Sequence, residues 1–140
     1  MEQKQTVSVY REKKSGNFRI QPFGKLPNGT SQPFGKQDYL PGSASNNQLT
    51  TALLENLSKN DEQVYEESLV QKVSREEQKQ VFSQQQLISI YRLGREYRIV
   101  PFRRMGNSFG SIDDMVQAVS SDEFVQRAGE IVRQLFEQIP

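Results

Sequence analysis

The chain has 140 residues, the usual size of one domain, and its 18 basic and 17 acidic side chains give a formal net charge of +1. It contains no cysteine and no histidine, which excludes disulfides and removes the usual zinc ligands, so we expect no metal and no other cofactor. Its apolar runs are far shorter than the roughly 20 residues of a membrane span, and its first residues lack a secretory signal, so we expect a cytoplasmic protein without a membrane partner.

Segments of the first half recur in the second half in the same order. The sequence VSVYR at residues 7–11 returns as ISIYR at 88–92, and FRIQPF at 18–23 returns as YRIVPF at 97–102. Two weaker matches follow: Phe34-Gly35 with Phe109-Gly110, and residues 45–49 with 120–124. An ordered series of matches indicates an internal repeat.

Each copy begins with a predicted β-hairpin, because its residues alternate between two faces as strands require. The first hairpin has a long loop at residues 12–17, whereas Gly94-Arg95 suits a two-residue type II′ turn with glycine first. Pro22 and Pro101 are expected to end the second strand of each hairpin, where a missing N–H costs least. Four further residues of the repeated blocks are expected in the core: Ile20, Phe23, Ile99 and Phe102.

A helix is expected after each hairpin. Ser45 with Gln48, and Ser120 with Glu123, have the spacing of a capping box, which satisfies free N–H groups at a helix start. Apolar residues then recur at helical spacing: Leu49, Leu53 and Leu57 in the first helix, and Phe124, Ala128, Ile131, Leu135 and Ile139 in the second. A further short helix is expected at residues 112–119.

These elements predict an α+β fold, in which two repeated β-hairpin–helix units build an antiparallel sheet with the helices packed against it. We expect residues 1–140 to form a single domain, with the repeat at 7–58 and 88–139 and a linker segment at 59–87. Within that segment a capping box predicts a short helix at 75–82.

The linker segment is also the acidic part of the chain. A run of glutamates there could be an ordinary solvated surface, but it could also dock a basic partner, since complementary charge steers association. The candidate partner-binding residues are Glu62, Glu66, Glu67, Glu76 and Glu77.

The second hairpin carries arginines interleaved with aromatic residues, a combination that suits single-stranded RNA. The candidate nucleic-acid-binding residues are Tyr91, Arg92, Arg95, Tyr97, Arg98 and Arg103. The balanced net charge favours a solvated sheet face over this use, so nucleic acid is the alternative partner and not the favoured one.

The sequence gives little sign of catalysis. It has no nucleophile–base pair, no phosphate-binding glycine motif and no metal signature, and it lacks the histidine most used for proton transfer near neutral pH. We therefore expect a binding protein and not an enzyme, with a small hydrolase or nuclease as the last-ranked reading.

A family resemblance is carried by GNFRIQPFGK at residues 16–25, by Gly29, by Tyr39-Leu40-Pro41 and by the leucine-rich helix that ends near Leu57. With these features the chain resembles small bacterial immunity proteins of contact-dependent growth inhibition (CDI) systems. The resemblance implies a cytosolic protein that binds and neutralises the C-terminal toxin domain of a cognate effector. Such toxins are often nucleases, which an acidic docking patch would suit.

Overall fold

The computed structural model describes residues 5–25, 27, 30–61, 84–105 and 108–140. Its elements in chain order are β1 (Gln5–Glu12), β2 (Phe18–Lys25), β3 (Ser31–Pro33), β4 (Asp38–Leu40), α1 (Asn46–Ser58), the 3₁₀ turn η1 (Lys59–Asp61), β5 (Gln85–Leu93), β6 (Glu96–Met105), β7 (Ser108–Ser111), the 3₁₀ turn η3 (Asp113–Met115), β8 (Gln117–Ser120) and α3 (Ser121–Gln138).

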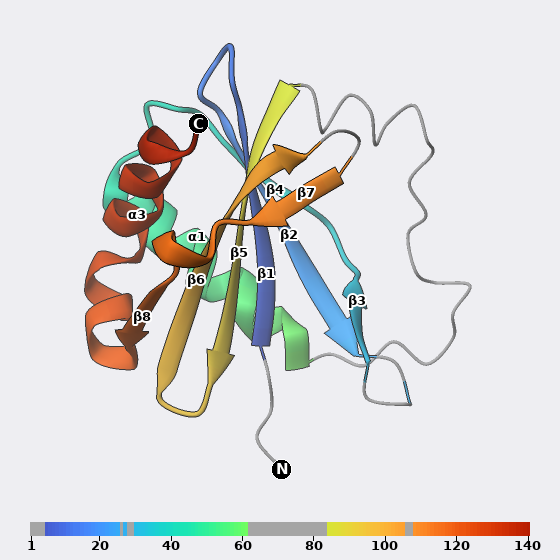
Figure 1. The fold of residues 1–140 in the computed structure, drawn as a ribbon. Helices are drawn as coiled ribbons and strands as arrows, with labels where there is room; N and C mark the ends of the chain where they lie inside the picture. The colour runs from blue at the N-terminus through green and yellow to red at the C-terminus, as the bar shows by residue number, and fades with distance from the viewer. Residues whose placement is uncertain (1–4, 26, 28–29, 62–83, 106–107) are drawn as a thin grey trace.

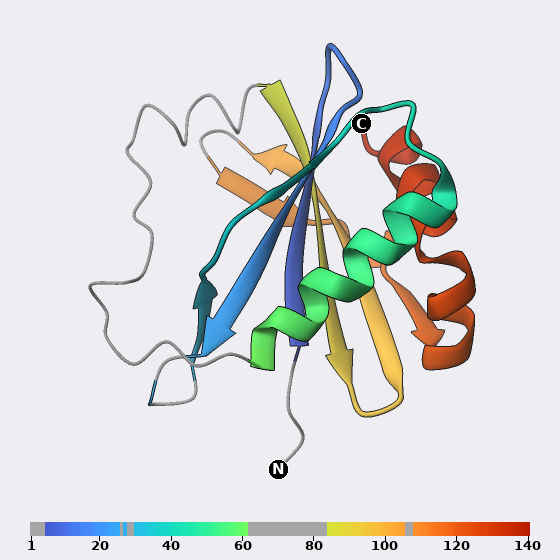
Figure 2. The ribbon, with the colours of Figure 1, turned by 180° about the vertical axis from the view of Figure 1, so that it is seen from behind.

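The strands form one curled antiparallel sheet with α1 and α3 against one of its faces (Figures 1 and 2). The strand order in the described part of the chain is β3-β2-β1-β5-β6-β7, while β4 also pairs with β2 and β8 with β6. The expected α+β class, with an antiparallel sheet and helices packed on it, is confirmed.

The two hairpins meet in the middle of the sheet. Strands β1 and β5 run antiparallel, with Ser8 opposite Ser89 and Val9 opposite Ile88. The second hairpin turns through Gly94-Arg95, since Leu93 pairs with Glu96 and Gly94 has a φ of 61°. The predicted two-residue turn with glycine first is therefore confirmed. Glycine suits this position because it adopts a positive φ at little steric cost.

The prediction that Pro22 and Pro101 end their strands is wrong, because both lie inside long strands. Residues of β2 before Pro22 pair with β4 and residues after it pair with β3. In β6 the partner changes in the same way from β8 to β7 around Pro101. A strand that exchanges one outer neighbour for another needs no N–H at the exchange point, so proline is tolerated there.

The core lies between the sheet and the two helices. It is one cluster that draws on both halves of the chain and includes the predicted stripes of both helices. Ile20 and Ile99 are fully buried as expected, but Phe23 and Phe102 are only half-buried, so their assignment to the core is wrong. Each phenylalanine is three residues from its isoleucine along the strand, and strand alternation turns it to the opposite face of the sheet.

The helices begin at the predicted caps. Ser45 Oγ accepts from the N–H of Gln48 at 3.1 Å while Gln48 Oε1 accepts from the N–H of Ser45 at 2.9 Å, a complete capping box. Ser120 Oγ accepts from the N–H of Glu123 at 3.3 Å. The bond from the N–H of Ser120 to the Glu123 side chain does not form at this cap, so only half of the second predicted capping box is present.

Replacing Ser45 with alanine is therefore expected to lower the free energy of unfolding by about 1 kcal/mol, because N–H groups at the start of α1 lose their acceptor. Chemical denaturation measures the change. Ser43→Ala is the control, since Ser43 is an exposed serine two residues earlier. Equal losses in the two variants would contradict the cap assignment.

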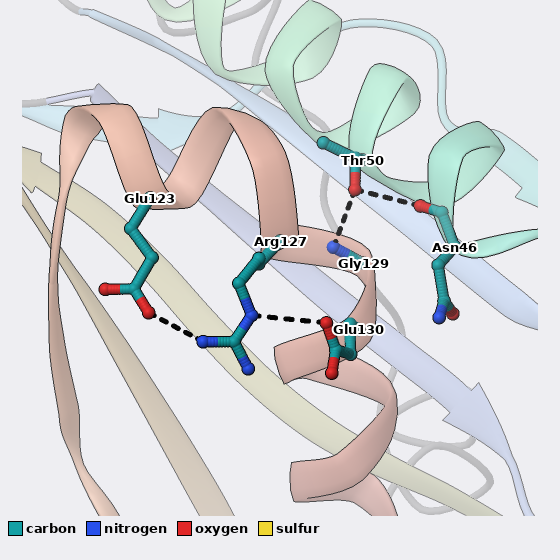
Figure 3. A network of polar contacts seen from close by, with 6 residues as sticks. All are labelled: Asn46, Thr50, Glu123, Arg127, Gly129 and Glu130. Atoms are coloured by element: carbon teal, nitrogen blue, oxygen red, sulfur yellow. Dashed lines mark hydrogen bonds and ion pairs between the residues drawn. The ribbon is translucent and has the colours of Figure 1, made fainter.

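The two helices are in close contact at a glycine. The N–H of Gly129 in α3 donates to Thr50 Oγ1 in α1 at 2.8 Å, and Thr50 Oγ1 donates to the carbonyl of Asn46 at 2.8 Å (Figure 3). On the exposed side of α3, Arg127 bridges Glu123 and Glu130 (Figure 3). These ion pairs lie within α3 and are exposed, so they contribute little stability and do not join the two helices.

Three further predictions concern the segment 112–119, the linker 59–87 and the helix at 75–82. The helix expected at 112–119 is wrong: residues Asp113–Met115 form one 3₁₀ turn and Gln117–Ser120 form β8, which pairs with β6. The predicted linker 59–87 overlaps described elements, since η1 occupies its start and β5 begins at Gln85. The helix predicted at 75–82 lies outside the described residues.

Candidate recognition surface

The face of the sheet opposite α1 and α3, here called the distal face, carries polar and aromatic side chains. Strand alternation and the strand registers assign its members: Thr6, Ser8, Tyr10, Arg19, Gln21, Phe23, Leu87, Ser89, Tyr91, Arg98, Val100 and Phe102. Its centre is shielded from solvent, since Ser8 is 9% and Gln21 5% exposed. Contact with another molecule is therefore expected at its rim.

A group of side chains at the β4 edge of this face forms a connected unit, here called the Tyr–Arg cluster: Tyr10, Arg19, Gln37, Tyr39 and Gln85. Register places Tyr39 of β4 beside Arg19 of β2, and Arg19 beside Tyr10 of β1. The guanidinium carbon of Arg19 lies 4.0 Å from the centre of the Tyr10 ring, the geometry of a cation–π contact.

Two glutamine side chains hold the guanidinium of Arg19 in place. Arg19 donates from Nη1 to Gln37 Oε1 at 3.1 Å and from Nη2 to Gln85 Oε1 at 2.9 Å. Gln37 Oε1 also accepts from the hydroxyl of Tyr39 at 3.1 Å, and its Nε2 donates to Gln21 Oε1. The arginine and the exposed tyrosine thus share one acceptor, which holds them in a defined relative position.

Burial raises the pKa of the Tyr10 hydroxyl above its usual value near 10, and the nearby charge of Arg19 opposes this shift without cancelling it. The neutral phenol is therefore favoured in the folded protein. Its contribution to the free energy of unfolding is fully present below the pKa that Tyr10 has in the unfolded chain.

Above about pH 10 the unfolded chain loses the Tyr10 proton before the folded protein does, so the free energy of unfolding is expected to fall as pH rises. The Tyr10→Phe variant cannot ionise there and should show a smaller fall between about pH 9 and pH 11. Urea denaturation across that range measures the difference. Identical slopes for the two proteins would contradict a raised Tyr10 pKa.

A second tyrosine–arginine pair lies on the same face in the other hairpin. Tyr91 of β5 is opposite Arg98 of β6, as Tyr10 of β1 is opposite Arg19 of β2. Arg98 is neutralised, because its Nη2 and Nε both lie 3.1 Å from Glu96 Oε2. Arg19 has only amide acceptors and no carboxylate within ion-pair distance among the described residues.

The six residues of the predicted nucleic-acid platform are not brought together. Tyr91 and Arg98 face the distal side, whereas Arg92 and Tyr97 pair on the helix side, with the guanidinium carbon of Arg92 5.6 Å from the Tyr97 ring centre. Tyr97 is 4% exposed and stacks on Phe124, so its ring is not accessible to a base. The remaining two residues, Arg95 in the turn and Arg103 far along β6, are exposed and separate.

The predicted acidic docking residues Glu62, Glu66, Glu67, Glu76 and Glu77 lie outside the described residues, so their role stays a prediction. Gln37 and Tyr39 lie at β4 and Gln85 lies at the start of β5, two distant segments that only the sheet brings together, so the sequence alone does not reveal these residues as a set. The alternation of the first hairpin was a usable signal, since it already places Tyr10 and Arg19 on one face.

The described part of the chain offers no group of three or more acidic side chains that could hold a metal ion. No helix among those described has the length and apolarity needed to cross a membrane.

No protein-family model matches this sequence, and a comparison with curated proteins finds no similar one. Solved structures do match. A protein of unknown function from Neisseria meningitidis, NMB0488, has a TM-score of 0.76 at 16% identity, over 100% of this chain and 98% of that chain. A chain of the CdiA-CT/CdiI toxin and immunity complex from Yersinia pseudotuberculosis has a TM-score of 0.72 at 13% identity, over 98% of both chains. This protein therefore shares its fold with a chain of a toxin and immunity complex, which supports the resemblance seen in its sequence.

Proposed function

We propose that this protein is an immunity protein of a CDI system, which binds and neutralises the C-terminal toxin domain of a cognate effector in the cytoplasm and has no catalytic activity of its own. The observation that carries the proposal is the likeness in fold, over 98% of both chains, to a chain of a CdiA-CT/CdiI toxin and immunity complex. The sequence resemblance to immunity proteins favours the immunity side of such a pair over the toxin side.

The chemistry of the chain also suits binding better than catalysis. The sequence has no histidine and no cysteine, and the side chains of the Tyr–Arg cluster are held by mutual hydrogen bonds. Tyrosine and arginine are the residue types most enriched where protein interfaces gain their binding energy. We propose further that the toxin is a nuclease.

Co-expression tests the proposal. The toxin domain would be the C-terminal region of the large effector encoded beside this gene, expressed under a tight promoter with and without the present protein. We expect growth arrest with the toxin domain alone, degradation of cellular DNA or RNA, full protection by the present protein, and co-purification of the two chains.

The outcomes separate the parts of the proposal. Loss of protection and of co-purification would refute the immunity role, whereas protection against a toxin that spares nucleic acids would refute only the nuclease assignment. Growth arrest caused by the present chain alone would place it on the toxin side.

The acidic residues Glu62, Glu66, Glu67, Glu76 and Glu77 remain our proposed contacts for a basic toxin surface. Reversal of these charges to lysine, in the full chain, should weaken toxin binding and make the remaining affinity less sensitive to salt. An unchanged affinity in the reversed variant would remove this segment from the interface.

We also infer that the two halves descend from one hairpin–helix unit that was duplicated. Three features support this: Ser8 and Ser89, equivalent in the repeat, face each other in the central strand pair; each hairpin exchanges outer neighbours at its proline; and a serine caps each helix. Equivalent core truncations, Ile20→Ala and Ile99→Ala, should then cost similar free energies of unfolding.

A further inference from the structure

We propose that Arg19 and Tyr39 form the anchor through which the partner protein docks, with the guanidinium of Arg19 receiving a carboxylate of the partner while the ring of Tyr39 packs beside it. This inference rests on the proposed function, because it names the surface and the chemistry of the same partner. It places a positive contact at the β4 edge of the distal face.

The first support is an uncompensated charge. A guanidinium has five N–H donors, and the structure assigns two of those of Arg19 to neutral amide oxygens. No carboxylate among the described residues lies within ion-pair distance of it, although Arg98, its counterpart in the second hairpin, has Glu96 at 3.1 Å. Half-buried charges are normally paired, so a half-buried guanidinium that has no carboxylate partner among the described residues fits an external carboxylate.

The second support is preorganisation. Tyr10 lies under the guanidinium at 4.0 Å, and Gln37 and Gln85 hold its two terminal nitrogens. A free arginine loses rotamer entropy when it binds, whereas an arginine already fixed from below and from two sides has little left to lose. The arrangement therefore holds the guanidinium in place before any partner arrives.

The third support is the exposure of Tyr39. This residue is 73% exposed, more than any other large hydrophobic side chain among the described residues. Its hydroxyl is fixed by the same Gln37 oxygen that binds Arg19. The Tyr39 ring is exposed and fixed, and it lies beside a fixed guanidinium that has no carboxylate partner among the described residues. Together they offer apolar area and charge, the combination found at interface hot spots.

The surroundings favour a protein over a nucleic acid as the occupant. Along the same row of the sheet, the residues beyond Tyr10 are Leu87 and Phe102, which are apolar. A nucleic-acid strand needs a track of cations, and the other arginine in a paired position on this face is neutralised. One cation flanked by apolar groups suits a single acidic side chain of a protein.

The test compares four full-length variants with the wild type for binding to the purified toxin domain. Arg19→Met keeps much of the side-chain length but removes the charge, Arg19→Lys keeps the charge alone, and Tyr39→Ala removes the ring. Arg98→Met is the matched control, because it removes an arginine from the equivalent position where the charge is already neutralised.

We expect Arg19→Met to weaken toxin binding about 30-fold or more, in line with truncation of a charged, hydrogen-bonded contact at an interface. Arg19→Lys should restore part of that loss, Tyr39→Ala should cost about tenfold, and Arg98→Met should stay within about threefold. The association rate of Arg19→Met should also depend less on salt than that of the wild type.

Titration calorimetry measures the affinities, and the melting temperature of each free variant reports any structural loss. If Arg19 only supports the sheet, Arg19→Met will lower the melting temperature while toxin affinity stays unchanged, and the inference is then wrong. It is also wrong if Arg98→Met weakens binding as much, or if Arg19→Met abolishes binding of a 20-nucleotide RNA but not of the toxin. If the wild type itself does not bind the toxin domain, the proposed function fails first and the anchor with it.

Discussion

Replacement of Phe124 with alanine is expected to lower the free energy of unfolding by about 3–5 kcal/mol. Phe124 is fully buried at the start of α3, and its ring stacks on Tyr97 of β6 with centroids 3.9 Å apart and planes inclined by 8°. The truncation removes apolar area from the core and leaves a cavity between helix and sheet. A loss of this size is a large part of the roughly 5–15 kcal/mol that stabilises a domain.

Urea denaturation followed by circular dichroism measures this change. Val125→Ala is the matched control, because Val125 is the next residue of the same helix but is 52% exposed. The control should alter the free energy of unfolding by less than about 0.5 kcal/mol. A Phe124→Ala loss below about 1 kcal/mol would contradict the packing of α3 on β6.

The second large effect is expected at Gly129, where α3 crosses α1. A Cβ added there would overlap the carbonyl oxygen of Asn46 and would lie 2.9 Å from Thr50 Oγ1. The overlapping atom belongs to the backbone of α1, so the two helices must move apart and the Gly129 N–H must lose its bond to Thr50. We expect Gly129→Ala to cost about 3 kcal/mol, the upper part of the range for overpacked sites.

This direction opposes intrinsic propensity, since alanine in a helix is favoured over glycine by about 1 kcal/mol. Gly110→Ala is the control: there a Cβ would overlap only the end of the Met105 side chain, which is flexible and 53% exposed. The control should therefore change stability little. A Gly129→Ala protein as stable as the wild type would contradict the close helix contact.

Much of the fold follows from local signals in the sequence. Alternation in residues 7–11 and 88–92 predicts the central strands, and the spacing of Ser45 and Ser120 to later polar residues predicts where both helices begin. The apolar stripes predict the buried faces of those helices, because helical periodicity depends on neighbours three or four residues apart.

The short outer strands were not predictable in the same way. Strands of three or four residues such as β4 and β8 carry no periodicity of their own, and their pairing with β2 and β6 is what makes them strands. Residues 112–119 are an example. Their apolar–polar pattern suggests a helix, but they form a 3₁₀ turn and then β8, which pairs with β6. Tertiary context overrides weak local preference at such positions.

The candidate surface was predictable only in part. The repeat indicates that arginines and tyrosines recur in both hairpins, but whether each arginine has a carboxylate partner depends on which acceptors the sheet brings to it. Glu96 neutralises Arg98 within one hairpin, whereas Gln37 and Gln85 reach Arg19 from two distant segments. That difference, on which the proposed anchor depends, has no signature in the sequence near Arg19.

The central position of β1 has a consequence for how the chain acquires its structure. β1 is hydrogen-bonded on one side to β2, which follows it directly, and on the other to β5, which begins only at Gln85. During translation the amino-terminal half can close its hairpin and cap its helix, but it cannot bury both flanks of its first strand until the second half emerges from the ribosome. Such long-range pairing slows folding and leaves the nascent first half exposed to chaperones and proteases until β5 has left the ribosome.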